Sequence, residues 1–167
     1  MPLIGIICFV LLYLYSSTLY PGGNQADLHS TGFDWTHNYW CNLMNESGMN
    51  GVKNNARPFA IAALIILCVG IVAFIINFAS AFCSSAVRRN ILTGAGIVSM
   101  ILAGLIFTKH HDLMIILSSF FGLIVVFLIA LELSKTNLVL YKLTGIFCLI
   151  LLGTNNFIYY SKHYIIV

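Results

Sequence analysis

Long apolar runs separated by shorter polar stretches dominate this chain of 167 residues. A helix needs about 20 apolar residues to cross the hydrocarbon core of a bilayer, which is about 30 Å thick. The runs therefore predict five membrane-spanning helices, over residues 3–19, 59–82, 91–108, 113–133 and 138–158. The expected fold class is all-α, a polytopic transmembrane bundle of about five spans that forms a single integral membrane domain over residues 1–167.

The two ends of the chain bear on the number of spans. No basic residue precedes the first apolar run, so we expect it to be retained as a helix rather than cleaved as a signal peptide. Residues 164–167 resemble the first turn of a sixth helix, which leaves a truncated six-helix bundle as an alternative.

The longest polar stretch is an extramembrane loop over residues 21–57. Pro21 and the two glycines after it end the first span, since proline lacks an N–H and glycine takes up turn geometry. Within the loop, apolar side chains recur at helical spacing from residue 34 to residue 46 and predict a short interfacial amphipathic helix. The side chains expected to bind a ligand or partner are Tyr20, Trp35, Asn38, Tyr39 and Trp40.

Composition supports the membrane assignment. Hydrophobic residues make up 60% of the chain and charged residues only 8%, and the mean hydropathy is +0.96. A soluble domain carries about 25% charged residues.

The net charge of +3 rests on few groups and no basic run accompanies it, so we expect no nucleic-acid partner. No two of the five cysteines form a local pair, and no disulfide is predicted.

Lysine and arginine near the spans set the orientation of a membrane protein. Four lie on each side of the predicted bundle, but those of the short turns fall within far fewer residues. We therefore expect the short turns and the amino terminus to be cytoplasmic and the long loop to be outside. With five spans, the loop and the corner at 109–112 share one side, which then holds all the histidines: His29, His37, His110, His111 and His163.

Two groups of residues could carry chemistry on that side. In the loop, His37 and Cys41 lie four residues apart and could reach one zinc ion, with Asp34 nearby; the alternative is an interfacial helix with its aromatic rings in the headgroup layer. At the corner, Asp112 is expected to cap the fourth helix. The functional alternative brings His110 or His111 close to His37 and Asp34, for metal binding or acid–base chemistry.

Polar side chains inside the predicted spans are few. Six of them are expected to form hydrogen bonds between helices: Asn77, Ser99, Ser118, Ser119, Asn155 and Asn156. On the third predicted helix, close packing is favoured by Gly96 and Gly104 and by the small residues Ala95, Ser99 and Ala103, spaced four apart. No charged residue lies in the middle of a span, and no internal repeat is evident, so transport is the least favoured function.

Four short motifs resemble a known family: STLYPGG at 17–23, GFDW at 32–35, NYWCNL at 38–43 and HDLM at 111–114. They are similar to bacterial polytopic membrane proteins grouped as domain of unknown function 998, which are distantly similar to the Frag/DRAM/Sfk-like membrane proteins. The resemblance implies a helical bundle of about six spans in a bacterial inner membrane, with no assigned activity. It also implies that the loop and the histidine corner belong to one site.

A second, weaker resemblance is to intramembrane metal hydrolases such as the alkaline ceramidases, although their helical His-xxx-His pair is absent. Two functions follow from these patterns, and whether the chain is an enzyme is left open. The first is recognition of a membrane lipid, or of a membrane-protein partner or second copy, through the outer loop. The alternative is a metal-dependent lipid hydrolase with catalytic residues Asp34, His37, His111 and Asp112, the metal being held by His37, His111 and Asp112. Apart from that zinc, no cofactor is predicted.

Overall fold

Helices account for almost all regular structure in the computed structural model of this chain, which describes residues 2–165. Side chains of the last helix are described as far as residue 151 and at residues 153, 154, 157 and 161. Between residues 2 and 165 the elements are α1 (Pro2–Thr18), the 3-10 helix η1 (Trp40–Met44), α2 (Arg57–Phe82), α3 (Ala86–Gly104), α4 (His111–Ser134) and α5 (Val139–Ile165). The expected all-helical fold is confirmed.

Three of these helices, α2, α3 and α4, are long and apolar enough to cross a membrane. Helix α1 is apolar but has 17 residues, which span about 26 Å. The first half of α5, Val139–Leu151, is also apolar and shorter. Residues 164 and 165 continue α5 and do not begin a sixth helix, whereas 166 and 167 lie outside the described residues.

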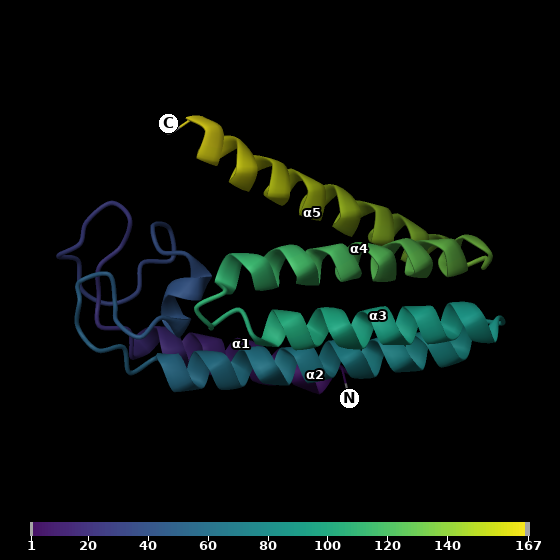
Figure 1. The fold of residues 1–167 in the computed structure, drawn as a ribbon, viewed down its shortest axis with the longest axis horizontal. Helices are drawn as coiled ribbons and strands as arrows, with labels where there is room; N and C mark the ends of the chain where they lie inside the picture. The colour runs from purple at the N-terminus through teal and green to yellow at the C-terminus, as the bar shows by residue number, and fades with distance from the viewer. Residues whose placement is uncertain (1, 166–167) are drawn as a thin grey trace.

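Successive helices run in opposite directions, so the connections alternate between the two ends of the bundle (Figure 1). The long loop, the connection from α3 to α4 and the carboxyl end of α5 lie at one end, which we call the loop end. The connections from α2 to α3 and from α4 to α5 lie at the other, the turn end. The loop and the histidine corner therefore share one end, as the sequence predicts; the side chain of His163 is outside the described residues.

Glycines set how closely neighbouring helices approach. A Cβ on Gly5 of α1 would lie 3.3 Å from the Cα of Gly70 on α2. A Cβ on Gly96 of α3 would lie only 2.7 Å from Cδ1 of Ile75 on α2. The predicted close packing of α3 is confirmed at Gly96, where an added Cβ would collide with Ile75. It is wrong at Gly104, where an added Cβ would meet no atom within 4 Å.

Two serines join α3 to α4. The Ser99 hydroxyl donates to the Ser118 carbonyl at 2.9 Å, and the Ser118 hydroxyl donates to the Ser99 carbonyl at 3.1 Å. This reciprocal pair confirms the interhelical role predicted for both serines. The prediction for Asn77 is wrong, because its amide donates within α2 to the Ala73 carbonyl. Ser119 is exposed, and the side chains of Asn155 and Asn156 lie outside the described residues.

Candidate functional site

Buried asparagines hold the long loop in a defined shape. Four of them have nearly inaccessible side chains: Asn24, Asn38, Asn42 and Asn54. The Asn54 amide alone donates to three backbone carbonyls, those of residues 42, 43 and 45, and its Oδ1 accepts the N–H of Ala56 at 3.0 Å. A loop with little regular structure must satisfy its backbone groups with side chains, and these amides do so.

The glycines after α1 begin this loop. Gly22 and Gly23 have φ angles of +129° and +79°, a region that other residues avoid. A Cβ on Gly23 would lie 2.4 Å from the backbone nitrogen of Asn50, so the second half of the loop packs directly against this turn. The Gly23 carbonyl also accepts the Asn38 amide at 2.8 Å.

Two of the five residues expected to bind a ligand or partner are part of this scaffold. Tyr20 is buried, and its hydroxyl accepts the N–H of Met49 at 3.1 Å; burial raises the pKa of Tyr20. Asn38 is also buried, and its Oδ1 accepts the N–H of Asp34 at 2.9 Å. Both side chains stabilise the loop and present little surface to a ligand.

The other three, Trp35, Tyr39 and Trp40, are about half exposed, with exposed fractions of 47%, 55% and 55%. Trp40 stacks on Tyr13 of α1 with ring centroids 5.2 Å apart, and Trp35 meets Trp40 edge to face at 6.1 Å. Contacts between neighbouring rings continue at both ends, giving one aromatic row: Phe9, Tyr13, Trp40, Trp35, Phe33 and Tyr20. The row joins the last turns of α1 to the loop and leaves both tryptophans accessible.

The predicted amphipathic helix over 34–46 is wrong in extent. Residues 35–37 form a turn, and within 34–46 only Trp40–Met44 is helical, as the 3-10 helix η1. The reason lies in the Asp34 carboxylate, whose Oδ1 accepts the N–H and the hydroxyl of Thr36 at 2.8 and 2.6 Å. Such a side-chain turn competes with helical hydrogen bonding. His37 and Cys41 are therefore not one helical turn apart on a common face.

Asp34 and His37 do form a close pair. His37 Nδ1 lies 2.8 Å from Asp34 Oδ2, and both side chains are at least one-third exposed. The hydroxyl and N–H of Thr36, together with the His37 ring, hold the pKa of the Asp34 carboxyl well below its usual range. A carboxylate so strongly stabilised is a poor general base near neutral pH, so the geometry favours a structural role for Asp34.

The histidine corner also differs from expectation. Helix α4 begins at His111, and its N-cap residue, His110, makes no side-chain capping bond. Asp112 lies in the first turn, so the prediction that it caps α4 is wrong; its carboxylate still stands near the positive end of the helix dipole. His111 Nδ1 lies 3.2 Å from Oδ1 of the exposed Asp112.

The loop and the corner meet in a pocket of about 190 Å³, as expected of one site, but through different residues. Of the four candidates for catalysis, only His111 lines it. The other lining residues are Cys41, Met44, Asn45, Ile106, Phe107 and Thr108. Apart from Cys41, a candidate zinc ligand, none of these residues was predicted from the sequence to belong to a site. For Ile106, Phe107 and Thr108 the available signal was their position at the end of a predicted span, on the same side as the loop. Burial raises the pKa of the Cys41 thiol, which favours its neutral form.

An apolar groove of about 380 Å³ lies between α2 and α3 and shares Phe107 with this pocket. Its wall includes Ile65, Val69, Ile97 and Ile101. Phe107 thus stands between a pocket with polar groups at the loop end and an apolar groove along the helices.

The candidate metal ligands are not gathered into a site. Across the residues that the structure describes, no three histidine, cysteine, aspartate or glutamate side chains lie close enough to hold one ion. Asp34 with His37 and His111 with Asp112 are two separate pairs. The proposed zinc set of His37, His111 and Asp112 does not assemble in this arrangement.

Comparison of the chain with protein-family models, with curated proteins and with solved structures finds no match. The resemblance to domain of unknown function 998 therefore stays a prediction from the sequence motifs.

Proposed function

We propose that this chain is a multi-pass integral membrane protein that recognises a membrane lipid through the exposed part of its aromatic row, Trp35 and Trp40, together with Tyr39. The observation that carries the proposal is that a loop held rigid by buried amides presents three half-exposed aromatic rings next to the end of an apolar helix. Tryptophan and tyrosine are enriched where membrane proteins meet the lipid headgroups, because their rings are apolar at one end and polar at the other.

The pocket and groove on either side of Phe107 support a lipid rather than a water-soluble ligand. The pocket offers the hydrogen-bonding side chains of Asn45, Thr108 and His111, which suit a headgroup. The groove between α2 and α3 is almost entirely apolar and suits a hydrocarbon chain. The helix η1 connects the aromatic row with the pocket, since it contributes Trp40 to the row and Cys41 to the pocket.

We place the protein in a bacterial inner membrane, as a member of the domain of unknown function 998 family, with five spans, a cytoplasmic amino terminus and the loop outside. The lysines and arginines concentrated at the turn end support this orientation, and the four sequence motifs support the family. Metal-dependent hydrolysis is not proposed, because no three candidate ligands converge among the described residues.

The two tryptophans give a direct test, because the chain contains no others and both lie in the aromatic row. In bilayers that contain brominated phospholipids, intrinsic fluorescence should be quenched strongly by bromine near the headgroup end of the acyl chain and weakly by bromine at its far end. Efficient quenching by aqueous iodide, with none by brominated lipid, would show that the aromatic row faces water and would rule out the proposal.

Lipid recognition is tested with a triple variant, Trp35→Ala, Tyr39→Ala and Trp40→Ala, assayed for phospholipids retained through purification in mild detergent. We expect it to lose a lipid that the wild type retains. The control is the double variant Leu28→Ala, Val52→Ala, which removes two equally exposed apolar side chains from the same loop. If both variants retain lipid like the wild type, the proposal is wrong; if the triple variant instead loses a protein partner or its oligomeric state, the surface binds protein.

A further inference from the structure

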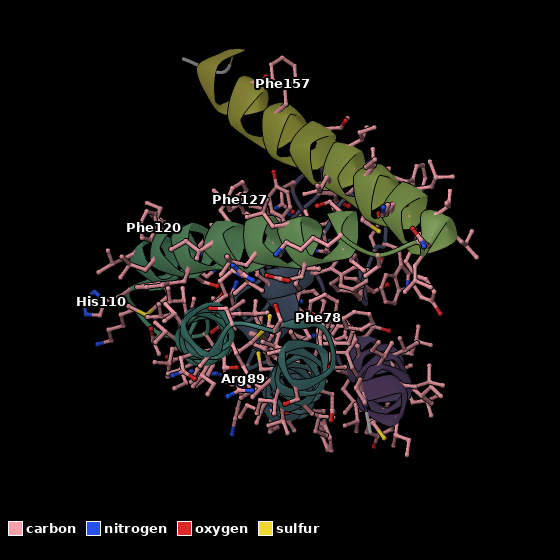
Figure 2. All side chains as sticks on the ribbon, turned by 90° about the vertical axis from the view of Figure 1, so that its right-hand side faces the viewer. Phe78, Arg89, His110, Phe120, Phe127 and Phe157 are labelled. Carbon is pink, nitrogen blue, oxygen red and sulfur yellow. The ribbon has the colours of Figure 1, made fainter. Side chains whose placement is uncertain are left out.

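Helices α4 and α5 meet at the turn end and then diverge (Figure 1). A groove of about 300 Å³ is lined by residues of both helices near that end. Its lining is almost entirely apolar and includes Ile129, Leu133, Gly145 and Ile146, and its two polar side chains are those of Ser134 and Lys142. Further along α4, Phe120 and Phe127 project from the face turned away from α2 and α3, and both are exposed (Figure 2). The outer face of α4 is thus left largely uncovered by α5.

A lysine stands in this groove. The Lys142 ammonium group donates to the Ser134 carbonyl at 3.0 Å, and it belongs to none of the ion pairs found among the described residues. Two neighbouring cations differ in this respect: Arg88 and Lys135 both pair with Glu132, whose side chain is 2% exposed. A carbonyl is a weaker partner for an ammonium group than an anion, so Lys142 can accept a stronger one.

The turn end also carries the whole net charge of the protein. By position in the sequence, it holds four of the eight basic residues, Arg88, Arg89, Lys135 and Lys142, but only one acidic residue, Glu132. The four basic residues of the loop end are balanced by four acidic ones, so the net charge of +3 belongs to the turn end alone. A positive end beside a bilayer attracts anionic headgroups.

We propose that the groove between α4 and α5 binds an anionic phospholipid, with an acyl chain between the helices and the phosphate on Lys142. The apolar lining matches a hydrocarbon chain, and the lysine matches the headgroup charge. A helix of a second copy is the competing occupant. The one acidic residue at the turn end of such a copy, Glu132, is already paired with Arg88 and Lys135, so it offers Lys142 no free anion.

This site rests on the membrane placement proposed above but not on the aromatic row, which lies at the opposite end of the bundle. The triple variant of Trp35, Tyr39 and Trp40 should therefore keep the lipid preference of the groove. Absence of quenching by brominated lipid in the wild type, with the lipid preference of the groove intact, would overturn only the loop proposal.

The test measures binding of phosphatidylglycerol and phosphatidylcholine with identical acyl chains to the full chain in detergent, by native mass spectrometry. The wild type should favour phosphatidylglycerol about fivefold, the contribution expected of one lysine near an anionic lipid. Lys142→Gln should abolish the preference and Lys142→Arg should keep it. Lys109→Gln, a matched change at the loop end, should leave it unchanged. Equal binding of the two lipids by the wild type, or an unchanged preference in Lys142→Gln, would overturn the proposal.

A second variant tests the acyl chain. Gly145 lines the groove, and a Cβ added there meets no atom within 4 Å, so Gly145→Leu should fill the groove without a clash. It should weaken binding of both lipids, whereas Gly153→Leu, which is equally unhindered and outside the lining, should not. Unchanged lipid binding by Gly145→Leu would sink the proposal. The proposal would also be wrong if glycerol 3-phosphate, which has no acyl chains, bound as tightly as phosphatidylglycerol. Dissociation of an oligomer by Gly145→Leu would show that the groove binds a second copy instead.

Discussion

At Asn54 a single side chain satisfies four backbone groups, because its amide donates to three carbonyls and its Oδ1 accepts an N–H. Few residue types could replace it: aspartate has no protons to donate, and leucine has no polar atoms at all. The position joins the 3-10 helix η1 to the start of α2, so one amide fixes the loop against the bundle. A sequence shows that an asparagine is present but not which carbonyls surround it, and Asn54 was therefore not singled out.

We expect Asn54→Leu to destabilise the loop by about 2–3 kcal/mol, since buried carbonyls left without donors cost about 1–3 kcal/mol. Limited proteolysis in detergent should show faster cleavage between α1 and α2. Asn45→Ala is the matched control, because Asn45 is an exposed asparagine of the same loop. Equal cleavage rates for Asn54→Leu and the wild type would show that the network is dispensable.

The pH dependence of the loop should reflect Asp34. Hydrogen bonds from Thr36 and the contact with His37 lower the pKa of this carboxyl when the protein is folded. A lowered folded-state pKa stabilises the fold above the unfolded pKa of about 3.9, and the stabilisation is lost only as pH falls through the folded value.

Acidification from pH 7 to pH 4 should therefore leave Asp34 ionised. A carboxyl ¹³C titration should show the Asp34 resonance unchanged over this range. A midpoint for Asp34 above pH 4 would contradict the hydrogen bonding described here.

Among the elements, the apolar helices were the most predictable, because a run of apolar residues long enough to cross a bilayer has few alternatives to a helix. The predicted span at 59–82 differs from α2 only by the two residues of its first turn. The loop was less predictable: the spacing of its aromatic residues fits a helix, but Asp34 and Thr36 form a side-chain turn that periodicity does not reveal. The same spacing nevertheless identified Trp35, Tyr39 and Trp40, which the structure leaves exposed.

The close contact between α2 and α3 predicts that no side chain larger than that of glycine fits at position 96. Gly96→Ala should destabilise the fold by about 1–3 kcal/mol, because its Cβ would collide with Ile75 and overpacking costs energies of this order. Ile75→Val should partly restore stability in the double variant by making room. Gly94→Ala, two residues away on the same helix, meets open space and should be neutral or slightly stabilising. Thermal unfolding followed by circular dichroism separates these outcomes, and equal melting of both alanine variants would refute the limit.

At the scale of the whole molecule, the alternating direction of the helices determines which connections lie together at each end (Figure 1). Counting spans predicted that the loop and the histidine corner lie together, and they meet in one pocket. Counting could not predict which side chains line that pocket, because this depends on how η1 packs beside the connection from α3 to α4. Counting spans also could not show that the pair of Asp34 and His37 lies apart from the pair of His111 and Asp112. From the sequence, the two pairs could have formed one site.

In a cysteine-free background, Leu28→Cys in the loop and His110→Cys at the corner should react from the same side of a sealed vesicle with an impermeant maleimide. Asn137→Cys, in the connection from α4 to α5, should react only from the opposite side or after permeabilisation. All three positions are exposed, so differences in labelling report sidedness rather than burial. Opposite accessibility of Leu28→Cys and His110→Cys would mean that the helices do not cross the bilayer as proposed.

The buried asparagines that hold the loop also determine how the loop responds to the salt concentration around it. Dissolved ions screen interactions between exposed charges, such as the pair of Arg57 and Glu46 at 3.1 Å, but they have little effect on hydrogen bonds between neutral buried groups. A loop held mainly by neutral amides keeps the spacing of its tryptophans in dilute and in saline surroundings alike. The loop should thus present the same aromatic surface at low and at high ionic strength.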